Sequence, residues 1–184
     1  RLFRRQRQMC IRDSFYSTMN AGKSTSLLQS SHNYEERDLN VLLFTPEVDA
    51  KIHDSFIHSR IGLKKPAYVF NEKFDFIDYV YKENKKRVSC ILVDEAQFLT
   101  SEQVKQLCRI CDEKNIPIMC YGIRTDFRGE LFPGSLALLS LADNIIELKT
   151  ICEYPSCSRK ATMIARYDKA VSYTHLRAHE TEYD

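Results

Sequence analysis

The sequence predicts an α/β domain in which a parallel sheet is flanked by helices, followed by a small second lobe. Its 184 residues are 43% hydrophobic, which suits one domain with a buried core. Short apolar runs alternate along the chain with segments of helical period. The runs are continuously apolar rather than alternating, as in parallel strands that are covered on both faces.

Four apolar runs predict strands. They are residues 40–45 (NVLLFT), 90–94 (CILVD), 117–122 (PIMCYG) and 144–148 (NIIEL). Residues 49–73 show no clean period, and we expect them to form a loop. After residue 150 the pattern changes to Cys, Pro and Ser, and the small second lobe is expected to begin there.

Three segments predict helices, at residues 23–37, 74–86 and 101–115. The first places Leu27, Leu28 and Tyr34 near one face. The third has Thr100 or Ser101 as its expected N-cap. Its apolar face, at helical spacing, consists of Val104, Leu107, Cys108 and Cys111.

Composition and charge exclude several classes of protein. Residues 1–14 hold five Arg and one Asp, so this segment has a formal charge of +4. The whole chain has a formal charge of +2, so the remaining residues together have a charge of −2. That balance argues against a protein that coats nucleic acid. No apolar run approaches the roughly 20 residues that span a bilayer, and no signal-peptide core is present. With seven Cys we expect a cytoplasmic protein with reduced thiols. In such a protein, pairs of Cys are better interpreted as metal ligands than as disulfides.

A phosphate-binding loop is predicted where the first helix begins. Gly22, Lys23 and Ser24 match the end of the pattern G-x-x-x-x-G-K-[ST], and Ser17 stands where its first Gly belongs. Such a loop turns backbone N–H groups toward a phosphate, and supplies a lysine for the β/γ oxygens and a hydroxyl for Mg²⁺. The alternative is an ordinary helix start with a solvated lysine.

A pair of carboxylates follows the second predicted strand. Asp94 and Glu95 end the run CILVDE, where the carboxylate that supports Mg²⁺ stands in phosphate-loop enzymes. Burying two adjacent carboxylates without a cation would be costly. The alternative is that both begin a solvent-facing loop. Together with the glycine-lysine-serine triplet, the pair predicts a site for Mg²⁺ and a nucleotide.

Several longer motifs resemble one enzyme family. These are STMNAGKST, LLFTPEVD, SRIGL, VDEAQFLT, CYGIRTDFRGELFPGS and IELKTICEYPSCSRKATMIAR, and in this order they look like thymidine kinases of the cytosolic type, from about Phe15 to Ala170. The resemblance implies a P-loop sheet domain with a small zinc-ribbon-like lobe, from which a loop closes over the thymine. It also implies nucleotide salvage by transfer of the γ-phosphoryl group of ATP to the 5′-hydroxyl of thymidine.

The resemblance assigns roles by matched position. Glu95 would be the general base for the 5′-hydroxyl, and Ser24 and Asp94 would support Mg²⁺. The positions matching the ATP and phosphate site are Ser17, Thr18, Met19, Asn20, Ala21, Gly22, Lys23, Ser24, Asp94 and Gln97. Those matching the thymidine pocket are Met19, Phe98, Ile123 and Phe127, for which spacing alone favours ordinary core. Asp49 and Lys51 match an acid and a basic residue near the phosphates, although Lys in place of Arg loses bidentate geometry.

Zinc is expected at Cys152 and Cys157, which align with the first metal pair of the family at a wider spacing. A structural zinc takes four ligands, and the family's second pair would lie further on than the matching segment. His175 and His179 loosely complete a Cys₂His₂ pattern as an alternative. Cys108 and Cys111 also form a C-x-x-C, but their helical phase favours buried core thiols.

Both ends of the chain look unlike the family. We therefore expect a non-family segment at 1–14, a kinase domain at 15–149, the start of the zinc lobe at 150–170 and a non-family tail at 171–184. Both ends resemble translated sequencing-adapter read-through, and the alternative for the N-terminal arginines is a nucleic-acid or targeting arm. With the closing loop and second metal pair missing, the chain is expected to be a truncated, impaired kinase.

The partners expected from the resemblance are thymidine, ATP, dTTP as a feedback inhibitor, and three further copies in a homotetramer. No nucleic acid or membrane partner is expected. Two other functions remain open on the residues alone. One is a generic P-loop ATPase module in which Glu95 activates water, and the other is a nucleic-acid-binding zinc module with a degenerate phosphate loop.

Overall fold

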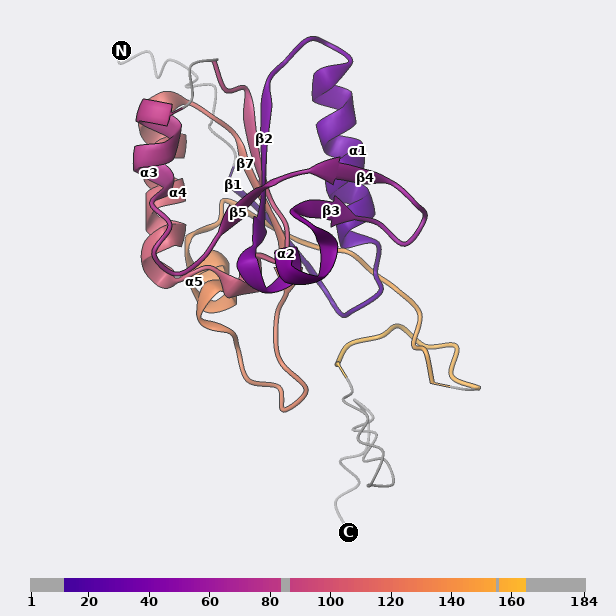
Figure 1. The fold of residues 1–184 in the computed structure, drawn as a ribbon. Coiled ribbons are helices and arrows are strands. Elements are labelled where there is room, and N and C mark those ends of the chain that lie inside the picture. The colour runs from indigo at the N-terminus through magenta and orange to yellow at the C-terminus, as the bar shows by residue number, and fades with distance from the viewer. Residues whose placement is uncertain (1–11, 84–86, 155, 165–184) are drawn as a thin grey trace, which may run out of the picture.

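A six-stranded parallel sheet forms the centre of the protein, in a computed structural model that describes residues 12–83, 87–154 and 156–164 (Figure 1). Its strand order is β5-β2-β6-β7-β1-β8, and every neighbouring pair runs parallel. The strands are β1 (Arg12–Ser17), β2 (Val41–Pro46), β5 (Tyr68–Phe70), β6 (Cys90–Val93), β7 (Ile118–Ile123) and β8 (Asn144–Glu147). The predicted strands at 40–45, 90–94, 117–122 and 144–148 are confirmed within a residue or two.

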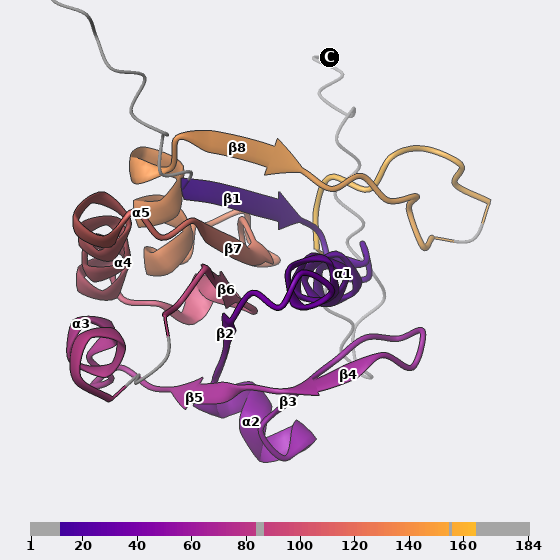
Figure 2. The same ribbon diagram turned by 90° about the horizontal axis from the view of Figure 1, so that it is seen from above.

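Helices cover both faces of this sheet (Figure 2). Helix α1 (Lys23–Glu35) lies on one face. Helices α3 (Phe76–Asp78), α4 (Ser101–Lys114) and α5 (Pro133–Leu141) lie on the other. The predicted α/β class with a parallel sheet is therefore confirmed.

Strand β6 shows how the sheet separates two hydrophobic cores. Cys90 and Leu92 pack toward α1, and Ile91 and Val93 pack toward α4. All four side chains are buried, because successive residues of a strand point to opposite faces and both faces are covered. The apolar run CILV therefore carries no alternation that would mark a solvent face.

Residues 49–73, expected as a loop, are largely structured. Helix α2 (Glu47–His53) follows β2, and an antiparallel pair, β3 (Phe56–His58) with β4 (Lys64–Pro66), precedes β5. Each of these strands has three residues, which is too short for a period to show. The expectation of a loop was therefore wrong, and the strands were missed because they are too short to show a period.

Two helical regions differ in smaller ways from expectation. The helix predicted at 74–86 is helical from Phe76 through a π-helical turn, η1 (Tyr79–Glu83), and residues 84–86 lie outside the described residues. Helix α5 is not among the predicted elements. Its sequence PGSLALLSL is apolar on most sides, so no 3.6-residue period marks it.

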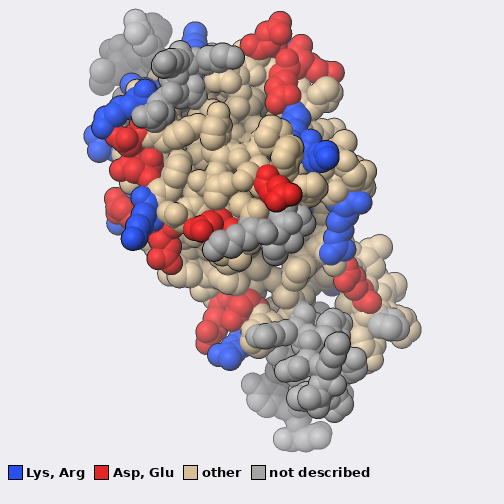
Figure 3. Space-filling model, viewed as in Figure 1, with Lys and Arg blue, Asp and Glu red and all other residues tan. Residues whose placement is uncertain are grey.

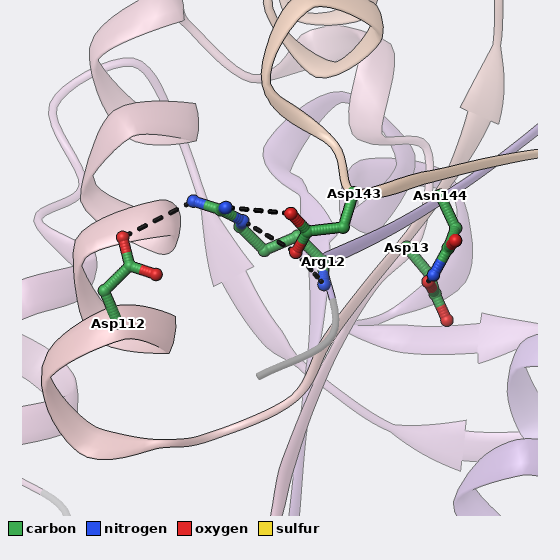
Figure 4. A network of polar contacts seen from close by, with 5 residues as sticks. All are labelled: Arg12, Asp13, Asp112, Asp143 and Asn144. Carbon is green, nitrogen blue, oxygen red and sulfur yellow. Dashed lines mark hydrogen bonds and ion pairs between the residues drawn. The ribbon is translucent and has the colours of Figure 1, made fainter. Parts of the chain in front are cut away.

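The first residues of β1 are fixed by a polar network (Figure 4). Arg12 donates to both carboxylate oxygens of Asp143, at 3.0 and 2.9 Å, and pairs with Asp112 of α4. The Asn144 amide donates to Asp13 at 2.8 Å. The hydrogen bonds from Arg12 hold the pKa of Asp143 below its usual range. Strand β1 thus begins at Arg12, before the expected domain start at Phe15.

The segment after β8 contains little regular structure. Within residues 148–154 and 156–164 it forms no named helix or strand, only an isolated antiparallel bridge between Ile151 and Lys160. The zinc-ribbon-like lobe expected there is not seen in this part of the chain. In the ranges that the structure describes, no helix is long and apolar enough to cross a membrane.

Charged side chains of both signs are interspersed on the face seen in Figure 3. Lysines and arginines lie mainly around its margin, beside aspartates and glutamates, and uncharged residues fill much of its centre. This face therefore presents no broad area of one sign.

Candidate functional site

The loop between β1 and α1 lies at the carboxyl end of the sheet, where parallel α/β proteins bind ligands. Two of its residues have left-handed backbones, Asn20 with φ 63° and Gly22 with φ 73°. Gly22 is the N-cap of α1, and no side chain caps the helix. The N–H groups of the first turn have no partner within the helix, so this end suits an anion.

Lys23 is buried in this loop, with 6% of its surface exposed. Its ammonium group donates to the carbonyl oxygen of Thr18 at 2.7 Å. Burial lowers the pKa of Lys23, and the charges of Glu95 and Asp94 oppose that shift. Lys23 is therefore not the solvated lysine of an ordinary helix start.

Polar contacts tie the rest of the loop to the segment after β8. The Ser17 hydroxyl, at the position of the first glycine in the pattern, donates to the carbonyl oxygen of Leu148. The Asn20 amide donates to Glu153. The loop is thus braced from the side of β8 as well as by Lys23.

Asp94 follows β6 and is 2% exposed. Its carboxylate accepts a hydrogen bond from the backbone N–H of Glu95 at 3.1 Å, and the nearby hydroxyl of Ser24 favours its charged form. Burial, and secondarily the charge of Glu95, raises the pKa of Asp94 to about 7. The alternative in which Asp94 begins a solvent-facing loop is wrong.

Glu95 has a left-handed backbone, with φ 45°, and begins the short 3₁₀ helix η2 (Ala96–Phe98). It is partly exposed, in contrast to its neighbour Asp94. One oxygen of its carboxylate accepts a hydrogen bond from Nε2 of Gln97 at 2.5 Å. One strand end therefore presents a buried and a partly exposed carboxylate side by side.

A third carboxylate lies near this pair. Asp49 of α2 accepts from the hydroxyl of Thr45 at 3.4 Å, and its charge adds to the rise in the pKa of Asp94. Strand β2, which leads into α2, is the neighbour of β6. Lys51 belongs to the same helix, but its side chain lies outside the described part of the chain.

The residues around Asp94 fit a magnesium ion. Mg²⁺ is commonly held by one or two carboxylates together with waters and substrate phosphates, so a set of three protein ligands is not required. Ser24 and Asp94 already face each other, and the buried carboxylate gains from a nearby cation. In the described ranges no group of three or more His, Cys, Asp or Glu side chains could hold a metal by itself.

The four side chains expected to bind thymidine are not core residues. Met19 is 57% and Phe98 is 41% exposed, and Ile123 and Phe127 are partly exposed. The core alternative for these positions is therefore wrong for Met19 and Phe98. Whether the four contact a nucleoside stays a prediction.

A cavity of about 220 Å³ is lined by Thr18 and Arg124, the sequence neighbours of Met19 and Ile123. Its lining includes Ser17, Thr18, Arg124, Thr125, Lys160 and Thr162. Thr18 Oγ1 is buried without a hydrogen-bond partner among the described residues, and the guanidinium of Arg124 lies 5.5 Å from the ring centroid of Tyr16. Arg124, Lys160 and Thr162 were not among the expected site residues, and no spacing in the sequence points to them.

Comparison with known families shows which family the chain belongs to. The family model described as "Thymidine kinase" matches residues 13–181. The chain belongs to the thymidine kinase family. The match extends beyond both ends of the segment from Phe15 to Ala170 on which the resemblance was based.

Curated thymidine kinases from bacteria are similar over most of the chain. The relative from Photorhabdus laumondii is 51% identical over 155 residues, which are 84% of this chain and 76% of the relative. The relative from Yersinia pseudotuberculosis is 49% identical over 162 residues, 88% and 81% respectively. That from Escherichia coli K12 is 50% identical over 157 residues, 85% and 75%.

The zinc site that thymidine kinases led us to expect is not formed by the described residues. Cys152 and Cys157 are partly buried on either side of a turn, where the N–H of Cys152 donates to the carbonyl oxygen of Arg159 at 2.8 Å. The described ranges offer this pair no set of further ligands. His175 and His179 lie outside the described ranges.

The remaining described cysteines of this thymidine kinase behave as core residues. Cys90, Cys111 and Cys120 are buried, as predicted, and Cys108 is half-buried against the core that contains Cys111 and Cys120. Burial raises the pKa of Cys90 to about 12 and that of Cys120 well above its usual range. A thiol that stays protonated is a poor nucleophile and metal ligand.

Proposed function

We propose that this chain transfers the γ-phosphoryl group of ATP to the 5′-hydroxyl of thymidine, giving dTMP and ADP. The observation that carries the proposal is the 49–51% identity to curated thymidine kinases over 84–88% of the chain. The buried Lys23 and the Asp94–Glu95 pair at neighbouring loops support it, because phosphoryl transfer depends on positioning and charge neutralisation.

In this proposal Lys23 and the N–H groups of the 17–22 loop bind the phosphates. Ser24 and Asp94 would hold Mg²⁺, which would neutralise charge on the phosphate oxygens when bound. Glu95 accepts the proton of the 5′-hydroxyl as that oxygen bonds to the γ-phosphorus. The bond between the γ-phosphorus and the β,γ-bridging oxygen breaks, and ADP leaves.

We also propose that part of the nucleoside occupies the cavity lined by Thr18 and Arg124, next to Met19 and Ile123. The unpartnered hydroxyl of Thr18 supports this placement, since a buried polar group costs free energy until it meets a partner. Phe98 and Phe127 would add apolar contact with the base. Feedback inhibition by dTTP and assembly as a homotetramer are proposals that the family resemblance alone supports.

Turnover assays with the full chain test these proposals directly. With Mg-ATP, we expect ADP release to depend on thymidine and to match dTMP formed, measured by chromatography. ADP release at the same rate without thymidine would identify a P-loop ATPase instead. Salt-sensitive binding of DNA with no thymidine turnover would favour a nucleic-acid module. Sedimentation velocity with and without dTTP tests the tetramer.

A further inference from the structure

The side chain of Gln97 connects the proposed base to the central sheet. Its Nε2 donates to Glu95 Oε2 at 2.5 Å, and its Oε1 accepts from the backbone N–H of Ile123 at 3.1 Å. We propose that Gln97 is a positioning residue that fixes the orientation of the Glu95 carboxylate for proton abstraction. This inference rests on the proposed function, because it takes Glu95 as the base.

The orientation of the Gln97 amide follows from its partner on β7. A backbone N–H donates and cannot accept, so the atom that faces Ile123 must be the carbonyl oxygen of the amide. The NH₂ group is then directed to Glu95. Ile123 is itself held in register with Ser17 of β1, so the amide is anchored to the centre of the sheet. Gln97 is only 3% exposed, which shields both hydrogen bonds from water.

Two glycines make room for the turn that carries Gln97. A Cβ at Gly122 of β7 would lie 2.8 Å from Gln97 Oε1 and 3.1 Å from its backbone nitrogen. A Cβ at Gly134 of α5 would lie 2.7 Å from the carbonyl oxygen of Ala96 and 2.8 Å from that of Gln97. The turn is therefore held closely between β7 and α5.

The backbone of Glu95 also requires this support. A left-handed conformation, here with φ 45°, is unfavourable for a residue with a side chain and persists only where its surroundings fix it. The Asp94 carboxylate accepts from the Glu95 N–H, and the Glu95 carbonyl accepts from the N–H of Phe98 at 3.1 Å. These bonds fix the backbone of Glu95, and Gln97 fixes its carboxylate.

Sequence matching assigned Gln97 to the ATP and phosphate site, and the positioning role proposed here differs from that assignment. Its amide oxygen and one amide hydrogen are committed to Ile123 and Glu95. A side chain committed in this way acts on the reaction through the base. Its loss should therefore change turnover rather than nucleotide binding.

The test is Gln97→Met in the full chain, because methionine has a similar length and no amide. We expect kcat to fall by about tenfold or more, since small misplacements of a catalytic group are costly. KM for ATP and for thymidine should stay within about twofold, because the binding groups are unchanged. Gln97→Glu keeps the acceptor for Ile123 but places a second carboxylate against Glu95, so its kcat should fall at least as far. If Gln97→Met does not fold, kcat and KM of Gln97→Glu are measured in its place.

Gln103→Met is the matched control. Gln103 is an equally buried glutamine whose amide bonds Thr100, Asn71 and Phe74, away from Glu95. We expect this variant to lower the melting temperature while kcat per folded molecule is unchanged. A similar loss of kcat in both glutamine variants would mean that Gln97 is merely structural, and would overturn the proposal.

The double variant Glu95→Gln/Gln97→Met separates this inference from the proposed function. If Gln97 acts through Glu95, adding Gln97→Met to Glu95→Gln should lower kcat no further. Losses that multiply, or a raised KM for ATP with normal kcat, would overturn the positioning role. A low kcat in Glu95→Gln together with a normal kcat in Gln97→Met would overturn the positioning role of Gln97 and leave Glu95 as the base. A normal kcat in Glu95→Gln would instead overturn the role of Glu95 as the base.

Discussion

The ammonium nitrogen of Lys23 lies 2.7 Å from the carbonyl oxygen of Thr18, so the lysine closes the loop that precedes it. The same cation neighbours the carboxylates of Asp94 and Glu95, whose charges act on its pKa. Lys23 therefore links the two parts of the site that the sequence presents about 70 residues apart. A substitution at this position should affect both the shape of the loop and its affinity for phosphate.

Lys23→Ala should weaken binding of a non-hydrolysable ATP analogue by about tenfold to a hundredfold and abolish transfer. The range corresponds to losing a hydrogen bond to a charged group, about 1.5–3 kcal/mol. Isothermal titration calorimetry measures the affinity. Lys105→Ala, at an exposed position on α4, is the control and should bind normally. Equal affinities for the Lys23→Ala variant and the parent would end the phosphate-loop assignment.

Glu95→Gln should leave nucleotide binding nearly unchanged and lower kcat by about a hundredfold or more, as expected for removal of a general base. The amide keeps the size of the side chain but cannot accept the proton. Steady-state turnover with saturating thymidine and Mg-ATP measures the effect. Glu102→Gln, in the exposed first turn of α4, serves as the control. Parent-like kcat in Glu95→Gln would remove this residue from the mechanism.

The sequence predicted those parts of the fold that carry a strong local signal. Helix α4 is the clearest case, because its apolar period is regular and Thr100 and Gln103 form a capping box at its start. Strand β6 was equally clear, because four consecutive apolar residues end in Asp94. By contrast, α5 is apolar on most sides and β3, β4 and β5 are too short to show a period.

The candidate site was predicted only in part, for a related reason. Gly22, Lys23 and Asp94 belong to short patterns, so their positions follow from the sequence. The bond between Gln97 and Glu95 depends on how η2 packs against β7, which no local pattern encodes. The exposure of Met19 and Phe98 depends likewise on tertiary structure, and spacing alone favoured the core.

Asp94→Asn should raise the melting temperature of the ligand-free protein while abolishing activity. A buried carboxylate is costly in its charged form, and asparagine retains an acceptor for Ser24 and for the Glu95 N–H. A gain of about 1 kcal/mol corresponds to about 2–4 °C for a protein of this size. Differential scanning fluorimetry measures the shift, and Mg-ATP should stabilise the parent but not the variant.

The control for this substitution is Asp112→Asn, at an exposed position on α4 where the charge costs little. It should change the melting temperature by less than about 1 °C and leave the effect of Mg-ATP intact. A lower melting temperature in Asp94→Asn would mean that Lys23 already compensates the carboxylate. In that case the buried charge would not be a cost that a bound cation relieves.

Gly134→Ala sets two effects against each other in α5. Alanine favours a helix over glycine by about 1 kcal/mol, which alone would stabilise the protein. The added Cβ, however, would lie 2.6 Å from the carbonyl oxygen of Leu99 and 2.7 Å from that of Ala96, and backbone atoms cannot rotate away. Overpacking costs about 1–3 kcal/mol, so we expect the melting temperature to fall by a few degrees. Because Gln97 lies in η2 and Glu95 directly precedes it, kcat should fall as well.

Ser140→Ala in the exposed part of α5 controls for helix propensity and should leave kcat unchanged. A higher melting temperature with normal kcat in Gly134→Ala would show that α5 does not hold the turn in place.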